Sequence, residues 1–377
     1  MAKVAAINSD RAWVSGAGPT GCLAALALVK AGWQVILHDS STSAELCSRS
    51  RAYALTNSSK KLLDQLDLWG ELSPRCQAFK TLLLSDKSTA KTVRFWQNNQ
   101  ELGWIINHPA LMDFLLAKCQ QHQAIQMRLG EASSGINSDI QLTVLAEGPN
   151  SSGRKALGIG FYGWPYRQGC LTVQVELQQG NSHNETAWEL FRPEGPLAVL
   201  PLGDGHAQVV WSAPLQQCRQ RAALAEPALL EKLSQVLPSQ IRPIAILDKP
   251  GAFAVEWRLA PKLVQGKVLL CGESAHRCHP VGGQGLNLCW RDVSTLLQEA
   301  KRQRQRGTGL ALLLARYQQR RWFDLLSTMV ATDALVRLFS NQQPLLRWFR
   351  SRVLELLKAS GLLRKLSLKL ASGAWTN

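Results

Sequence analysis

The stretch VLLCGESAHRCHPVGGQGLNLCWRD, residues 268–292, carries the strongest structural signal in this chain. It begins with a short apolar run that is typical of a buried strand in a parallel sheet. The run breaks at Gly272, turns at Pro280 and enters a glycine pair. From Leu286 the pattern predicts a helix whose first turn carries free backbone N–H groups, which stabilise a negatively polarised ligand atom. The glycine pair on its own also fits an ordinary strand-to-helix crossover.

A second glycine-rich segment, GAGPTG at residues 16–21, lies between a short apolar run and an Ala/Leu-rich helical pattern. In a dinucleotide site Gly16 makes the tight turn, Gly18 lets the backbone approach a pyrophosphate, and Gly21 packs the helix close to the strand. Asp39 ends the next apolar run, and its carboxylate would accept bonds from ribose hydroxyls. The alternative is an ordinary strand–helix–strand unit without a ligand.

The composition is that of a globular protein with room for two domains, with 377 residues and 46% hydrophobic content. No run approaches the roughly 18 apolar residues of a membrane-spanning helix, and the first ten residues lack the pattern of a signal peptide. The nine cysteines form no Cys-x-x-Cys pair, which favours a reducing cytosol. Cys271, Cys278 and Cys289 lie near two histidines, but their spacing matches no standard zinc pattern, so we expect no metal site.

The net charge of +16 indicates an acidic partner. No helix-turn-helix, finger or RNA-binding sheet motif is evident, so we expect no nucleic-acid partner. Eight basic residues and one acid lie from Arg337 onward, interleaved with leucines and aromatic residues. This pattern predicts amphipathic helices that lie along an anionic membrane surface. The alternative is a helix pair that packs on the protein's own core.

The periodicity changes at Cys170, after which apolar and polar residues alternate as in a half-buried strand. Three further strand-like runs follow, separated by hairpin-type breaks at residues 193–196 and 203–205. The segment therefore predicts an antiparallel sheet, one face of which should roof an apolar pocket beside the cofactor.

Residues 268–292 resemble the Gly-Asp-Ala-Ala-His…Pro…Gly-Gln-Gly…Asn…Asp signature of flavoprotein aromatic hydroxylases, which have the para-hydroxybenzoate hydroxylase fold. Residues 49–55, RSRAYAL, are similar to the Arg-Ala-x-Ala-Leu segment of ubiquinone-biosynthesis hydroxylases. Residues 316–321 and 332–341 resemble C-terminal segments of the octaprenyl-phenol hydroxylases of that pathway. The resemblance covers nearly the whole chain.

Three positions depart from the family pattern. Glu147 and Glu273 stand where relatives carry aspartate, which keeps the charge but moves the carboxylate by one methylene group. Cys289 replaces a glycine that most relatives have. In the family the turn at Glu147 lies near the cofactor and also meets the nicotinamide.

The resemblance implies an α/β fold in which a Rossmann-type FAD-binding domain is interleaved with an antiparallel-sheet substrate domain and followed by a helical C-terminal region. We expect the FAD-binding domain at residues 10–77, 106–165 and 263–330, the substrate domain at 78–105 and 166–262, and basic amphipathic helices at 331–377.

The resemblance also implies one bound FAD, visited transiently by NAD(P)H. Glu273 should reach a ribityl hydroxyl and Arg51 should contact the flavin, while His276 and Pro280 lie near its ring; no residue is identifiable as the general base. The expected cofactor-binding residues are Gly16, Gly18, Gly21, Asp39, Arg51, Gly272, Glu273, Pro280, Gly283, Gln284, Gly285, Leu286 and Asn287.

The implied activity is that of an FAD-dependent monooxygenase, which uses NAD(P)H and O₂ to hydroxylate a lipid-soluble polyprenylated phenol in quinone biosynthesis. We expect a cytoplasmic enzyme bound peripherally to an anionic membrane, with other quinone-biosynthesis enzymes as further partners. Two alternatives are a flavin-dependent prenyl reductase, which shares the fold class, and a non-catalytic FAD-stabilised scaffold of a quinone-synthesis assembly, which the three departures keep open.

Overall fold

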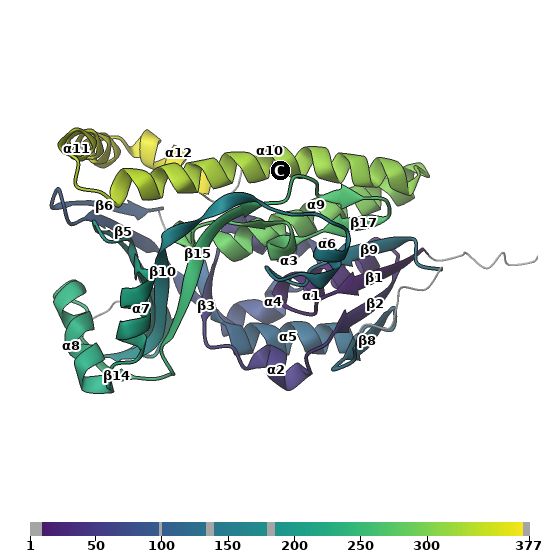
Figure 1. The fold of residues 1–377 in the computed structure, drawn as a ribbon, viewed down its shortest axis with the longest axis horizontal. Coiled ribbons are helices and arrows are strands. Elements are labelled where there is room, and N and C mark those ends of the chain that lie inside the picture. The colour runs from purple at the N-terminus through teal and green to yellow at the C-terminus, as the bar shows by residue number, and fades with distance from the viewer. Residues whose placement is uncertain (1–9, 98–99, 133–138, 179–184, 372–377) are drawn as a thin grey trace, which may run out of the picture.

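Two sheets of different type and a layer of C-terminal helices make up the molecule (Figure 1). The computed structural model describes residues 10–97, 100–132, 139–178 and 185–371 of the chain. The expectation about a signal peptide therefore lies outside the described residues. Within those ranges, none of the helices has the length and apolar character needed to cross a bilayer.

The first sheet is parallel except for one edge strand, in the order β16-β17-β9-β1-β2-β8. Its central strands are buried along almost their whole length, as the apolar runs of the sequence predict. The strands are β1 (Arg11–Ser15), β2 (Gln34–Asp39), β8 (Ile125–Leu129), β9 (Leu142–Leu145), β16 (Val264–Gln265) and β17 (Val268–Leu270).

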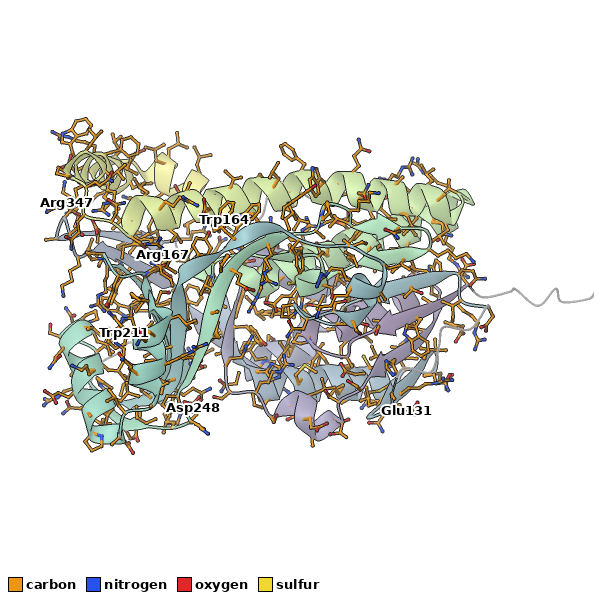
Figure 2. All side chains as sticks on the ribbon, in the orientation of Figure 1. Glu131, Trp164, Arg167, Trp211, Asp248 and Arg347 are labelled. Carbon is orange, nitrogen blue, oxygen red and sulfur yellow. The ribbon has the colours of Figure 1, made fainter. Side chains whose placement is uncertain are left out.

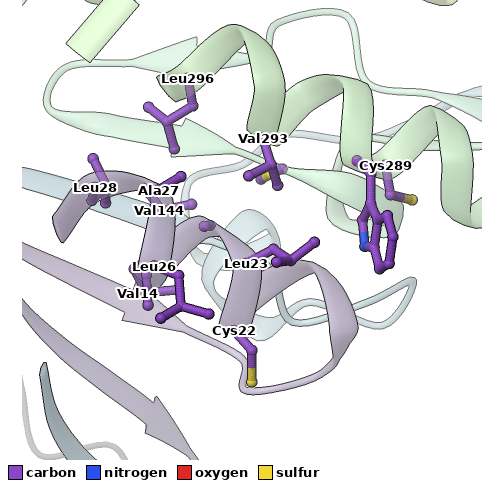
Figure 3. Packing of buried hydrophobic residues seen from close by; sticks show 14 of the residues in the cluster. Val14, Cys22, Leu23, Leu26, Ala27, Leu28, Val144, Cys289, Val293 and Leu296 are labelled. Atoms are coloured by element: carbon purple, nitrogen blue, oxygen red, sulfur yellow. The ribbon is translucent and has the colours of Figure 1, made fainter. Parts of the chain in front are cut away.

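Helix α1 (Pro19–Lys30) packs between this sheet and two further helices, α5 (His108–Gln121) and α9 (Gln284–Arg306). A helix that is apolar all round must be buried, and every residue of α1 from Gly21 to Val29 is buried. Figure 3 shows the contact of α1 with the sheet and with α9, formed by Val14, Leu23, Leu26, Ala27, Val144, Val293 and Leu296.

The second sheet has the order β18-β15-β10-β13-β12-β11-β5-β6, with β14 paired to β10. Its neighbours are antiparallel except for the parallel pair β11–β5. The strands are β5 (Thr81–Asp86), β6 (Lys91–Trp96), β10 (Tyr162–Leu177), β11 (Thr186–Phe191), β12 (Leu197–Gly203), β13 (His206–Pro214), β14 (Pro243–Ile246), β15 (Gly251–Leu259) and β18 (His276–Arg277).

The two faces of this second sheet have different partners. One face packs its leucines, valines and tryptophans against α7 (Leu215–Ala222) and α8 (Glu226–Val236). The opposite face contacts a small sheet formed by β3 (Ala52–Leu55), β7 (Gly103–Asn107) and β4 (Gln77–Phe79). The predicted α/β class, with a parallel sheet, an antiparallel sheet and a helical C-terminal region, is confirmed.

The C-terminal helices α10 (Leu310–Phe339), α11 (Pro344–Ala359) and α12 (Gly361–Ala371) lie along the upper side in Figure 1. The end of α10 and the inner side of α11 pack on β5 and β6 through an apolar cluster, in which Phe339 stacks on Phe191 with ring centroids 4.1 Å apart. The C-terminal helices therefore belong partly to the core of the protein.

Two local expectations from the sequence are wrong. The sequence pattern of residues 57–69 predicts one helix from Asn57 to roughly Trp69, but this helix is interrupted. Helix α3 (Asn57–Gln65) ends where Asp67 adopts a left-handed backbone (φ 58°), and α4 (Trp69–Leu72) follows. Arg350, counted among the surface charges, is fully buried. Its guanidinium donates to the carbonyls of Leu338, Phe339 and Asn341, which satisfies acceptors at the C-terminus of α10.

Candidate functional site

The segments that the sequence predicts to bind a cofactor meet at one edge of the parallel sheet. The strands β1, β2, β9 and β17 run in the same direction, so the loops that follow them emerge at the same edge. Gly272 lies against Thr20 in the first turn of α1, and Ser274 donates to the carbonyl of Gly148 after β9. Ligands of open α/β sheets bind at this carboxyl edge.

The three glycines of the 16–21 loop have different surroundings. Gly16 has a φ of 100°, and a Cβ there would lie 2.4 Å from the carbonyl oxygen of Ala146. A Cβ on Gly21 would lie 1.7 Å from the carbonyl oxygen of Gly16, so both positions exclude any side chain. Gly18, at the N-cap of α1, has no neighbouring atom within 4 Å of an added Cβ. The loop is thus closely packed on one side and open at the start of α1.

The carboxylate of Asp39 binds the same loop. One oxygen accepts from the N–H of Ala17 at 2.7 Å, and the other accepts from the N–H of Ser41 at 2.8 Å. The sequence analysis predicted ribose hydroxyls as its partners and missed these backbone bonds. Because an ionised carboxylate offers about four acceptor positions, two remain for a ligand.

The start of α9 forms the second open helix terminus. Gly282 and Gly283 both adopt left-handed conformations, with φ of 65° and 64°, and no side chain caps the helix. Gly283 packs against Ala54 of β3, whereas an added Cβ on Gly285 would meet no atom within 4 Å. The first N–H groups of a 23-residue helix therefore face an unobstructed space beside Gly285.

Asn287 holds this helix start in place. Its side-chain nitrogen donates to the carbonyls of Ala54 and Gly283 at 2.7 and 2.8 Å. Its oxygen accepts from Ser59 Oγ at 2.6 Å and from the N–H of Thr56 at 2.9 Å. With all these bonds made inside the protein, the side chain links α9 to β3 and α3.

A buried charge network fixes the loop between β17 and α9. Asp292 accepts from the N–H of Gly272 at 2.7 Å, from Arg321 Nε at 2.6 Å, and is 2.8 Å from His276 Nε2. Burial alone would raise the pKa of Asp292, but the charges of His276 and Arg321 and the hydrogen bonds lower it below its ordinary value. Asp324 continues the network by pairing with Arg321 and with Arg291. The carboxylate of Asp292 therefore stays ionised inside the protein.

The two glutamates that replace the family's aspartates differ in their contacts. Glu147 accepts from Ser15 Oγ and Ser151 Oγ, both at 2.6 Å, and from the N–H of Gly153 at 2.9 Å. It closes the turn after β9. Glu273 is partly exposed, with Arg277 at 4.0 Å, so its carboxylate is accessible at the carboxyl edge of the parallel sheet.

The predicted segment 49–55 lies between the two sheets. The guanidinium of Arg51 lies 6.0 Å from the ring centroid of Phe253 on β15. Ser50 donates to Asp248, which also accepts from the N–H of Gln174 on β10 at 2.7 Å; Figure 2 labels Asp248 at the end of the second sheet that faces this segment. This segment links the parallel-sheet unit to the antiparallel sheet.

Two buried titratable residues beside the Pro280 loop were not named by the sequence analysis. Burial lowers the pKa of His279 to about 4, and its Nδ1 accepts from the N–H of Val281. Burial raises the pKa of Glu189 to about 7, while the N–H of Gly282 lowers it. The one sequence signal for Glu189 is an acid within the apolar run Trp188–Phe191. In the part of the chain that the structure describes, no group of three metal-binding side chains is present.

Comparisons with known proteins agree with this geometry. The family model of the FAD binding domain matches residues 112–323, which is more than half of the chain. The chain belongs to this FAD-binding family. FAD is therefore the cofactor of this protein.

Relatives are similar along most of this FAD-binding chain. The 3-demethoxyubiquinol 3-hydroxylase of Escherichia coli (strain K12) is 29% identical and covers 96% of this chain and 97% of its own length. The ubiquinone hydroxylase UbiL of Rhodospirillum rubrum is 26% identical, covering 87% of this chain and 81% of the relative. The rat ubiquinone biosynthesis monooxygenase COQ6 is 25% identical, with 78% and 74% covered.

Solved structures share the fold. The p-nitrophenol 4-monooxygenase PnpA of Pseudomonas putida DLL-E4 matches with a TM-score of 0.81 at 18% identity, covering 97% of this chain and 98% of that one. HpxO of Klebsiella pneumoniae, solved with FAD and uric acid, matches with a TM-score of 0.74 at 17% identity, covering 98% and 97%. At these identities the likeness establishes the architecture.

The open position at Gly18 gives a direct test of the FAD site. We expect Gly18→Ala to leave the apoprotein folded, because the added methyl group meets no protein atom within 4 Å. The same methyl group should crowd a pyrophosphate at the start of α1 and weaken FAD binding by about 1–3 kcal/mol, measured by fluorescence titration with FAD. Gly70→Ala, at an equally open glycine in α4, is the matched control. Unchanged FAD affinity in Gly18→Ala would contradict the assignment.

Proposed function

We propose that this protein is an FAD-dependent monooxygenase that hydroxylates the ring of a polyprenylated phenol in quinone biosynthesis, with NAD(P)H as reductant. The main observation in support is that α1 and α9 both have at their start a glycine with unoccupied space beside it, Gly18 and Gly285, in a chain of the FAD-binding family. Relatives named as ubiquinone-biosynthesis hydroxylases cover most of the chain and support the choice of substrate class.

The residues at the two helix starts fit FAD. The absence of any atom near an added Cβ on Gly18 or Gly285 leaves space for a ligand beside free backbone N–H groups. The α1 start would hold the pyrophosphate and the free acceptor positions of Asp39 would hold the ribose. The α9 start would lie at the flavin ring, with Arg51, Glu273 and Pro280 at its edges. When bound, FAD supplies the oxidation of NAD(P)H and the activation of O₂.

The protein contributes position, electrostatics and exclusion of water. The N-terminus of α9 stabilises negative charge that develops on a neighbouring ring. The second sheet contributes apolar side chains to the face that lies toward this site, among them Ala187, Leu200 and Leu202, and these limit the access of water to the reacting groups. His276 is buried and bound through Nε2 to Asp292, so it supports the loop between β17 and α9.

Isotope incorporation distinguishes the proposed reaction from its alternatives. FAD-loaded protein supplied with NAD(P)H, a short-chain prenylphenol and ¹⁸O₂ should yield a product with one ¹⁸O atom, measured by mass spectrometry. A prenyl reductase would turn over without O₂ and yield a saturated chain. A scaffold would catalyse neither reaction, although its deletion would lower the abundance of partner enzymes. Turnover with no label in the product would refute the monooxygenase assignment.

We infer further that the outer side of the C-terminal helices docks on an anionic membrane, which gives the enzyme access to a lipid-soluble substrate. Large apolar side chains on these helices are exposed, among them Phe323 and Leu345 at 76% each, Trp348 at 58% and Leu362 at 69%. Exposed basic residues accompany them, and Figure 2 shows Arg347 on α11 at the outer end of this layer. Glu355, the acid of α11 and α12, is paired with Lys91 and Arg352.

Vesicle binding tests this surface. The variants Lys358→Gln and Lys365→Gln combined should weaken binding to vesicles of equal phosphatidylglycerol and phosphatidylcholine by about 2 kcal/mol, since each basic residue near an anionic surface contributes about 1 kcal/mol. Sedimentation with the vesicles measures the effect. Lys232→Gln with Lys249→Gln, on α8 and a neighbouring loop, is the charge-matched control. Equal vesicle binding by both double variants would contradict the proposal that the C-terminal helices dock on the membrane. Arg350 is left intact because it supports α10, and the side chain of Lys369 lies outside the described residues.

A further inference from the structure

Glu189 occupies the middle of β11 and points away from the α7–α8 layer. Its neighbours in sequence, Trp188 and Leu190, belong to the apolar cluster beneath those helices. Because side chains alternate along a strand, the carboxylate of Glu189 lies on the opposite face of the sheet. On that side Phe191, two residues along the strand, packs in one apolar cluster with Val281 of the loop that leads into α9. The N–H of Gly282 in this loop lowers the pKa of Glu189. The carboxylate therefore borders the loop at which the flavin ring is proposed to bind.

The surroundings of Glu189 provide little compensation for a negative charge. Its partners across the strands are Ala198 on β12 and Leu84 on β5, and the residue is only 9% exposed. Burying a carboxylate without a cation costs several kcal/mol, so a fold keeps such a group where its chemistry is needed. Burial raises the pKa of Glu189 to about 7, and the Gly282 N–H opposes that rise.

Other titratable groups near this position do not supply the missing cation. The ion pair of Asp86 and Arg350 lies two residues along β5 from Leu84 and is balanced within itself. The Cys170 thiol on β10 is neutral, because burial raises its pKa to about 12, and burial lowers the pKa of His279 to about 4, which keeps the imidazole neutral. No other charged side chain among the described residues contributes to the pKa of Glu189.

The same face of the sheet offers space and further polar atoms. The strand register places Glu189 in one row with Ala198, Val210 and Thr172, whose side chains are all smaller than leucine. Beside this row, Gln208 is fully buried and donates to Thr172 Oγ1 at 2.7 Å, while its Oε1 has no hydrogen-bond partner. A buried acceptor without a donor is costly, and a hydroxyl-bearing ligand would satisfy it.

We propose that Glu189 is the general base that accepts the proton of the substrate's phenolic hydroxyl. This proposal rests on the hydroxylase function proposed above. The O–H bond of the phenol breaks, a carboxylic O–H bond forms on Glu189, and the electron pair left on the phenolic oxygen enriches the ring carbons ortho and para to it. Those carbons are the nucleophiles that take up one oxygen atom of O₂.

The proton balance closes within the same turnover. When the hydroxylated carbon loses its hydrogen as a proton and the ring regains aromaticity, Glu189 returns its proton to the phenolic oxygen. The proton from the ring carbon and the hydride of NAD(P)H, the two-electron reductant, combine with the second atom of O₂, which leaves as water. The hydrogen of the new hydroxyl group comes from one solvent proton. Glu189 is thus a carboxylate before and after each cycle.

A binding experiment without O₂ tests the base independently of oxygen transfer. Oxidised, FAD-loaded protein is titrated with a short-chain prenylphenol between pH 6 and pH 9, and the change in flavin absorbance gives the dissociation constant at each pH. In the wild-type protein the dissociation constant should fall as the pH rises through about 7, because the ionised carboxylate is the stronger acceptor for the phenolic O–H. In Glu189→Gln it should not change with pH, and Glu189→Asp should recover part of the pH dependence. Glu176→Gln, the same substitution on the same face of β10, should behave as wild type.

Turnover adds a second readout. Hydroxylated product from Glu189→Gln should fall by about 100-fold, the lower end of a general-base contribution, while anaerobic reduction of the flavin by NAD(P)H stays unchanged. Since the carboxylate must be ionised to accept a proton, the wild-type rate should rise through a pKa near 7. The rate of the variant should not increase near pH 7, and it should increase only as the pH approaches the pKa of a free phenol, about 10.

The outcomes separate this proposal from the function on which it rests. A pH dependence of phenol binding that is lost in Glu189→Gln supports contact between Glu189 and the phenolic hydroxyl even if no ¹⁸O enters the product, in which case the hydroxylase assignment alone fails. The same pH dependence of binding in both proteins, or hydroxylation as fast in Glu189→Gln as in the wild type, overturns the base. A merely structural Glu189 would be revealed by a lower melting temperature of the variant at pH 8. We expect no such loss, because the amide removes a buried charge.

Discussion

The hydrogen bonds and the ion pair of the buried Asp292 carboxylate fix the geometry of the proposed cofactor site. The carboxylate joins the loop after β17, the helix α9 and the helix α10 through Gly272, His276 and Arg321. Removing one partner of a buried ion pair costs about 3–5 kcal/mol, because the other charge is left uncompensated. The three elements are therefore fixed relative to one another, and the glycine-rich start of α9 is held at the carboxyl edge of the sheet.

This constraint extends to the chemistry through a short series of contacts. Asn287 links the same helix to β3, and Val281 in the loop before the helix packs in one apolar cluster with Phe191 of β11, two residues from Glu189. One loop thus borders both the proposed flavin site and the proposed base. Because catalytic groups lose efficiency when displaced by even 1 Å, a buried charge network is a suitable support for them.

The sequence predicted those features that depend on local spacing. Two motifs can be recognised from spacing within one short segment: the glycines at 16, 18 and 21, and the run from 268 to 292. The parallel sheet, the FAD-binding family and the α/β class were therefore predicted correctly. The sequence did not single out Glu189, and it placed Arg350 among the surface charges, because the surroundings of both residues depend on partners far away in the chain. Glu189 comes near the loop before α9 only after β11 has paired, and Arg350 is buried only when α11 folds back on α10. The exposed side of the C-terminal helices follows the amphipathic pattern, while the packing of their inner side on β6 required the tertiary structure.

The measurement that tests this account most directly is an experimental structure of the protein with FAD and a prenylphenol bound. The account predicts that FAD extends from the start of α1 to the start of α9, and that the phenolic oxygen lies within hydrogen-bonding distance of Glu189 while the ring of the phenol faces the flavin. An FAD molecule whose ring lies away from residues 280–285, or a phenol bound on another face of the second sheet, would contradict it.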